Sequence, residues 1–370
     1  MLEILKQSIN PELCIPLVGA VIEKAKEFQE KFGRKPAFME VCGSHTMALA
    51  RTGVKQRLRE YVNLVSGPGC PVCVTDQKSI DAMIALADGD NRIICTFGDM
   101  MRVPGSDRTL LDSKIAGSDI RVVYSPTDTI KIAEENPDKE VVFLGIGFET
   151  TIPIFTLMVG EAEQRGISNF SIWMATKLVE PVLRYLLETG GVNLDGFMLP
   201  GHVSIVLGED SYRFLADEYH ISGVIMGFET AELLSGIYKL IDLALKEEPA
   251  ILNNHRSVVT KTGNQVIHQW LKKYLTTSDE PWRGIGVIPK SGLDLKPEYE
   301  QYNAKKRFTV EVGEPKKTKC RCGEVIRGLI SPDQCPLFAK SCNPMKPIGP
   351  CMVSSEGSCA AYYQYMRESF

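Results

Sequence analysis

The chain has 370 residues, 44% of them hydrophobic and 24% charged, which is ordinary for a folded protein of two or three domains. Its formal net charge of −4 argues against the basic surface that nucleic-acid binding requires. No apolar run approaches the ~20 residues that span a bilayer, and the start MLEILKQSINPELC lacks the features of a signal peptide. We therefore expect a cytoplasmic protein that binds neither nucleic acid nor membrane.

The first predicted element is an amphipathic helix over residues 11–32, begun by a proline and ended at Gly33. Four units of strand, turn and helix follow, and their strands begin at AFMEV, VNLVS, NRIICTF and DIRVVY. A second series of four begins at KEVVFLGIG, FSIWMAT, LDGFMLP and ISGVIMG. Short apolar strands that alternate with helices predict parallel α/β sheets.

Eight such units are too many for one comfortable sheet, so we predict an α/β fold with two Rossmann-like parallel-sheet domains and a small cysteine-rich C-terminal region. The expected divisions are a helical segment at 1–34, a first α/β domain at 35–137, a second at 138–248 and the C-terminal region at 249–370. Residues 281–319 are rich in Pro, Gly and Lys, and we expect them to be irregular.

The 11 cysteines are unevenly distributed. In a reducing compartment this number suggests metal or thiol chemistry rather than structural disulfides. Cys14 and Cys95 stand alone and are predicted to be buried structural thiols. A larger group crowds the tail with the spacing C-x-C-x12-C-x6-C-x8-C-x7-C and consists of Cys320, Cys322, Cys335, Cys342, Cys351 and Cys359.

Three kinds of site fit this tail: a [4Fe–4S] cluster, a zinc site, or thiols without metal. Structural zinc sites usually show paired C-x2-4-C knuckles, and the tail has C-x-C without C-x-x-C. Proline after Cys335 is typical of cluster loops, because it keeps the chain from continuing as a helix. A cluster is therefore favoured, and since it needs four thiolates, two cysteines are left over.

A second set of thiols follows two neighbouring strands near the N-terminus. Cys42 lies in EVCGSHT, and Cys70 and Cys73 form the C-x-x-C of GPGCPVC. Both motifs come directly after a strand and before a helix, the edge where open α/β sheets place their sites. Helix N-termini favour thiolates there, so we expect a lowered thiol pKa and three thiolates around one metal. His45 can point into the same crevice as acid, base or hydrogen-bond donor.

The alternatives to this interpretation are a simple redox dithiol for the C-x-x-C pair and a structural role for His45. Further polar residues follow the other strands: Asp99 in TFGDMMRVPG, Glu149 in GFETT and His202 in PGHVS. Each of them alone is more often a helix cap or turn residue than a catalytic one. Together they place polar groups where a site between two domains would need them.

The motifs CGSHT, GPGCPVC, TFGDMMRVPG, GFETT and PGHVS, together with the cysteine-rich tail, resemble those of the HypD family of hydrogenase maturation factors, over about residues 38–365. The resemblance implies a scaffold that acts with HypC while the iron of [NiFe]-hydrogenase receives its CO and CN ligands. HypE, supplied by HypF, would dock on this complex, and the Fe(II) unit carrying CN and CO would pass to the hydrogenase large subunit. Cys42, Cys70 and Cys73 would then hold iron, and the tail would hold the [4Fe–4S] cluster.

The tail also resembles ferredoxin:thioredoxin reductase, in which a cluster lies beside a redox-active disulfide. That resemblance implies that Cys320, Cys335, Cys342 and Cys359 ligate the cluster and that Cys322 and Cys351 form the redox pair. Two alternatives to the scaffold follow. One is a cluster-dependent disulfide reductase, and the other is a zinc-stabilised binding protein.

Overall fold

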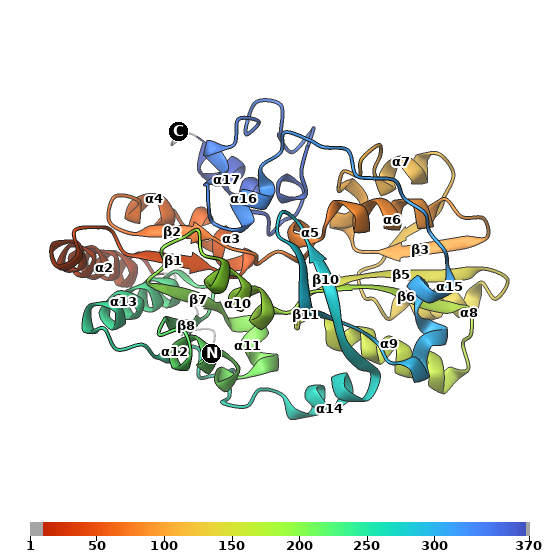
Figure 1. Cartoon of the computed structure of the whole chain (residues 1–370), viewed down its shortest axis with the longest axis horizontal. Helices are drawn as coiled ribbons and strands as arrows, with labels where there is room; N and C mark the ends of the chain where they lie inside the picture. The colour runs from red at the N-terminus through yellow and green to blue at the C-terminus, as the bar shows by residue number, and fades with distance from the viewer. Residues whose placement is uncertain (1–9, 368–370) are drawn as a thin grey trace.

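A computed structural model describes residues 10–367 of the chain. It contains two parallel β-sheets side by side, a two-stranded antiparallel hairpin between them, and a C-terminal region that lies over the junction (Figure 1). The predicted α/β class with two Rossmann-like sheets is thus confirmed. Within the described part, no helix is both long and apolar enough to cross a bilayer.

The first sheet has the strand order β2-β1-β7-β8-β9, and all its pairings are parallel. Its strands are β1 (Ala37–Glu40), β2 (Asn63–Ser66), β7 (Gly196–Pro200), β8 (Ser222–Met226) and β9 (Ile251–Asn253). One face is covered by α2 (Pro11–Phe32), α3 (Gly43–Arg51), α4 (Val54–Leu58) and α13 (Thr230–Lys246). The N-terminal helix has the predicted bounds, because Asn10 caps its start and Gly33 ends it in a left-handed conformation.

The second sheet has the order β4-β3-β5-β6, again parallel. Its strands are β3 (Arg92–Thr96), β4 (Asp119–Val122), β5 (Glu140–Gly147) and β6 (Phe170–Thr176). Its helices are α6 (Gln77–Ala87), α7 (Leu110–Ile115), α8 (Asp128–Glu135) and α9 (Ile152–Arg165). Every residue of β6 is buried, as expected for a strand that helices and loops cover on both faces.

The expected boundary near residue 138 does not separate the two sheets. β3 lies before residue 138 and pairs with β5, which lies after it. In the same way, β1 pairs with β7, although the segment between them makes up more than half of the α/β part of the chain. The chain leaves the first sheet after β2, builds the whole second sheet, and returns at β7. Local sequence patterns identify parallel strands but carry no information on which distant strand each one pairs with.

The remaining elements lie in the connecting segments of the chain. They include α5 (Pro71–Val74), α10 (Val179–Thr189), α11 (Gly201–Leu207), α12 (Arg213–Asp217) and α14 (Gln265–Tyr274), with the 3-10 turns η1 (Gly98–Arg102) and η2 (Glu209–Tyr212). The largest core runs through both sheets, α5 and the C-terminal region without interruption. The two halves therefore share one hydrophobic core at the site.

The expectation of irregular chain from 281 to 319 is wrong for its first part. β10 (Leu275–Trp282) and β11 (Gly286–Leu295) form an antiparallel hairpin, followed by η3 (Pro297–Tyr302) and α15 (Ala304–Arg307). The hairpin was missed because glycine and proline interrupt its alternating pattern. The tail contains the short elements α16 (Cys322–Ile326), η4 (Pro332–Gln334), η5 (Pro350–Met352) and α17 (Ser358–Tyr365).

Candidate functional site

The loops after β1 and β2 contact each other backbone to backbone. The Gly43 amide donates to the Gly69 carbonyl at 3.2 Å, and the Gly67 amide donates to the Glu40 carbonyl at 2.9 Å. A Cβ atom at Gly69 would lie 2.5 Å from the Cα of Cys42, so only glycine allows this approach. The loop that carries Cys70 is thus held directly against Cys42.

Cys70 and Cys73 are joined as a disulfide across the first turn of α5, with their Cα atoms 5.2 Å apart. Pro71 begins this turn, and the Cys73 amide donates to the Cys70 sulfur at 3.1 Å. Both side chains are buried. The pair is therefore in its oxidised state, in which neither sulfur is a thiolate ligand.

Cys42 occupies the N-cap position of α3 and is buried. Burial raises the pKa of its thiol to about 11, and the negative charge of Glu356 adds to this effect. The amides of His45 and Ser44 act in the opposite direction, as expected at a helix N-terminus, but they do not outweigh burial. The predicted lowering of the Cys42 pKa is therefore wrong. A bound cation would be needed to hold this sulfur as a thiolate near neutral pH.

Glu356 is a site residue that the sequence did not reveal, because it comes from the distant tail. Its Oε1 accepts a hydrogen bond from the Ser44 hydroxyl at 2.6 Å. Asp99 holds the same loop, accepting from the Ser354 hydroxyl at 3.2 Å and the Ser355 amide at 3.1 Å. Asp99 therefore acts on the site through this loop, as a positioning residue.

His45 is fully buried in α3, and its hydrogen bonds define its tautomer. Its Nε2 lies 3.2 Å from the Met226 carbonyl and 3.1 Å from the Gly227 carbonyl, so Nε2 carries the proton. Its Nδ1 is buried and has no hydrogen-bond partner within residues 10–367. Burial lowers the pKa of His45 to about 4, so the ring is neutral and Nδ1 is a free acceptor.

The loop after β8 links His45 to His202. The ring of Phe228 lies 4.8 Å from the ring of His45 and stacks on that of His202 at 4.0 Å. His202 itself is exposed. Phe228 belongs to GFETA, a near copy of GFETT, and that repetition was the signal that could have identified it.

Glu149 lies at the end of β5, on the edge of the second sheet that faces the first. Its Oε1 accepts from the Val179 amide at 2.8 Å, and its Oε2 is buried without a partner in the described chain. Burial raises the pKa of this carboxyl to about 7. Tyr212 lies close enough to both Glu149 and Cys42 for their charges to raise its own pKa further, after the larger effect of burial. Tyr212 thus connects the edges of the two sheets.

All six cysteines of the tail line one small, almost entirely apolar cavity. Cys322 contacts both Cys320 and Cys351, and Cys351 also contacts Cys359. The Ile348 amide donates to the Cys342 sulfur at 3.3 Å. The sulfur atoms therefore converge, and the contact between Cys322 and Cys351 is one of several in the cavity.

This donor set fits an iron–sulfur cluster in chemistry. It consists of thiols in a dry cavity, and amide donors reach the sulfur atoms. A Cβ at Gly349 would lie 2.6 Å from the Cys320 sulfur, so the backbone there forms a wall against the thiols. Among residues 10–367, however, no three or more His, Cys, Asp or Glu side chains have the arrangement that would hold a single metal ion. Both α16 and η5 pack against α5, so the cavity adjoins the Cys70–Cys73 turn.

Comparison with known proteins identifies the family. A family model described as "HypD: Hydrogenase formation hypA family" matches residues 17–366. The chain belongs to the HypD family. It is 41% identical over 363 residues to "Hydrogenase maturation factor HypD" of Escherichia coli (strain K12), which covers 97% of this chain and 96% of the relative. It is 38% identical over 362 residues to the protein of the same name from Rhodobacter capsulatus, with 96% of each chain covered. It is therefore a hydrogenase maturation factor, as the sequence motifs predicted.

Proposed function

We propose that this protein, together with HypC, is the scaffold on which the Fe(CN)2CO unit of [NiFe]-hydrogenase is assembled. The observation that carries this proposal is the direct contact of the Cys42 loop with the loop of Cys70 and Cys73, at the carboxyl edge of the first sheet. Family membership supports it. HypE, with HypF upstream, would supply the cyanide group, and the hydrogenase large subunit would receive the finished unit.

The iron unit is the cargo in this proposal, and thiolates are suited to hold it. Low-spin Fe(II) with CO and CN needs soft, electron-rich ligands. Cys42 would supply one permanent sulfur. Cys70 and Cys73 would supply two more only after reduction, so their disulfide makes cargo binding depend on redox state.

His45 and Glu149 would handle protons near this cargo. The free Nδ1 of His45 can accept a proton or a hydrogen bond, and the high pKa of Glu149 lets its carboxyl release a proton near neutral pH. Release of the Cys42 proton on metal binding needs such an acceptor. We propose that His45 is this acceptor.

In the tail, Cys320, Cys335, Cys342 and Cys359 would hold a [4Fe–4S] cluster. Such a cluster, when bound, supplies electrons one at a time. Cys322 and Cys351 are the remaining thiols of the cavity, and their contact is suited to a disulfide that could exchange with other thiols. Because α5 packs against this region, reduction of the Cys70–Cys73 pair would need only a short transfer.

Infrared spectroscopy of the protein co-purified with HypC tests the proposal. We expect intense CO and CN stretching bands that disappear in Cys42→Ala. Cys95→Ala is the matched control, because Cys95 is buried in the second sheet away from the loops of the site, and its bands should persist. Unchanged bands in Cys42→Ala, or no bands in the wild-type complex, would refute the scaffold role of Cys42.

A second candidate function is a cluster-dependent disulfide reductase, favoured by the contact between Cys322 and Cys351. This candidate predicts that the purified protein, with an electron donor, reduces oxidised thioredoxin without any hydrogenase partner. Cys322→Ser and Cys351→Ser should each abolish that turnover, while Cys42→Ala should not. Failure of the wild-type protein to reduce thioredoxin would exclude this candidate.

A further inference from the structure

The tip of the β10–β11 hairpin lies between the two thiol centres. On one side, Trp282 forms a β-bridge with Thr75, and the Arg283 amide donates to the Val74 carbonyl at 2.8 Å. These contacts are made directly after Cys73. On the other side, Gly284 lies against Gly323, which follows the C-x-C pair of the tail. The hairpin tip is therefore a common neighbour of both centres.

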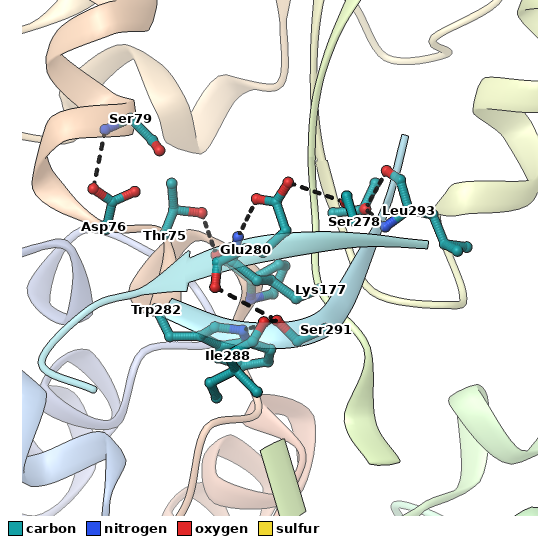
Figure 2. Close-up of polar contacts among 12 residues, drawn as sticks. Thr75, Asp76, Ser79, Lys177, Ser278, Glu280, Trp282, Ile288, Ser291 and Leu293 are labelled. Carbon is teal, nitrogen blue, oxygen red and sulfur yellow. Dashed lines mark hydrogen bonds and ion pairs between the residues drawn. The ribbon is translucent and has the colours of Figure 1, made fainter. Parts of the chain in front are cut away.

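A buried ion pair fixes this hairpin to the second sheet. The Lys177 ammonium, at the end of β6, lies 3.0 Å from a carboxylate oxygen of Glu280, and both side chains are almost fully buried. Figure 2 shows Lys177 directed at Glu280, and the indole of Trp282 directed at Ser291. The Trp282 Nε1 donates to the Ser291 hydroxyl at 2.7 Å. These contacts hold the hairpin tip, and with it Arg283, in a fixed position.

That residue, Arg283, has three guanidinium nitrogens with different surroundings. Its Nε donates to the Thr75 carbonyl and its Nη1 to the Gln77 side chain, both at 2.9 Å. Its Nη2 is buried and has no partner in the part of the chain that the structure describes. A buried donor without an acceptor destabilises a protein, so an acceptor is expected here.

The Arg283 side chain lies at the C-x-C end of the tail. It lines the same surface cavity as Cys320 and Cys322. The Arg283 charge therefore lies next to the C-x-C cysteines, at one end of the thiol cavity.

We propose that Arg283 tunes the reduction potential of the tail centre, through its charge and its free N–H group, while its other two nitrogens hold the turn that follows Cys73. This proposal rests on the proposed function, because it requires the iron–sulfur cluster in the tail. Reduction adds one negative charge to a cluster, and a neighbouring cation or N–H···S bond stabilises that charge. Loss of Arg283 should therefore lower the midpoint potential.

The test is a redox titration of the anaerobically purified protein, followed by the absorbance of its iron–sulfur centre. Arg283→Gln should lower the equilibrium constant for reduction at least tenfold, which is about 59 mV for a one-electron couple. Arg327→Gln is the matched control, since Arg327 lies in the same cavity and its Nε already donates to the Gly323 carbonyl at 3.3 Å. Its potential should fall by less than that of Arg283→Gln, because this variant loses a charge in the same cavity but none of the buried, unpartnered N–H groups of the described chain.

Equal potentials in Arg283→Gln and wild type would overturn the inference, as would an equal shift in Arg327→Gln. If Arg283→Gln does not fold, Arg283→Lys decides. It keeps the charge but loses the planar fork, so we expect about a threefold change, and no change would count against the proposal. A wild-type protein without an iron–sulfur centre would refute the cluster assignment itself. An iron–sulfur centre whose midpoint potential is the same in wild type and Arg283→Gln would refute this inference alone.

Discussion

Replacing Glu149 by glutamine should change how the stability of the protein depends on pH. The carboxyl is buried, its Oε2 lacks a hydrogen-bond partner within residues 10–367, and burial raises its pKa from 4.5 to about 7. The folded state thus binds this proton more tightly than the unfolded state does. As the pH rises from 4.5 through 7, the folded protein loses stability, and above 7 the loss is complete.

The magnitude follows from the pKa difference. A difference of roughly 2.5, at 1.36 kcal/mol for each unit of pKa, corresponds to about 3.4 kcal/mol. About 0.8 kcal/mol of this is already lost at pH 5, where an unfolded carboxyl is largely ionised. Between pH 5 and pH 8, the wild type should therefore lose about 2.5 kcal/mol more than Glu149→Gln.

Guanidinium unfolding of both proteins at pH 5, 6, 7 and 8, under anaerobic conditions, measures this difference. Glutamine keeps an oxygen that can accept from the Val179 amide. Its NH2 group can change the free energy of unfolding, but by the same amount at every pH. That amount cancels, because only the pH dependence of the two proteins is compared. Titration of His45 is common to both proteins and cancels as well. Glu60→Gln, at an exposed carboxylate, is the control and should parallel the wild type. Parallel curves for the wild type and Glu149→Gln would refute the reasoning.

Three further changes test other parts of the site. Lys177→Met should destabilise the protein by about 3 kcal/mol in denaturant unfolding, because it leaves Glu280 buried without this partner, and adding Glu280→Leu should restore most of the loss. Gly69→Ala should cost about 2 kcal/mol and speed the alkylation of Cys42 by iodoacetamide, since a Cβ there collides with the Cys42 backbone. Glu356→Gln should lower the pKa of Cys42 from about 11, so its alkylation at pH 9 should be several-fold faster, and an unchanged rate would contradict the charge effect.

Sequence alone predicted the strands of the two sheets well, because a short apolar run between glycine turns is too short for a buried helix and suits a buried strand. β5 and β6, for example, lie where their apolar runs placed them. Strand order could not be predicted, because the pairing of β1 with β7 joins segments far apart in the chain. The β10–β11 hairpin was not predicted, for a different reason. It is partly exposed and contains Pro281 and Pro289, so it has neither the burial nor the regular alternation that marks a strand.

The residues of the candidate site also differ in how far the local sequence reveals them. Cys42, Cys70 and Glu149 were predicted because each closely follows a strand, and parallel strands bring their ends to one edge. Glu356 and Arg283 were missed because the tail and the hairpin reach the site only through tertiary packing. The Cys42 pKa was predicted in the wrong direction because burial, which exceeds the effect of the helix N-terminus, is not visible in a motif.

The alternation of the chain between its two sheets has a consequence for synthesis on the ribosome. Once β1 and β2 have emerged, the internal strand β1 keeps an open edge until β7 arrives, about 130 residues later. At about 5–20 residues per second, this delay is roughly 7–26 s. An unpaired strand edge invites pairing with another chain. A fragment ending at residue 137 would carry two such edges permanently, on β1 and on β3, so we expect neither half of the protein to be obtainable by cutting there.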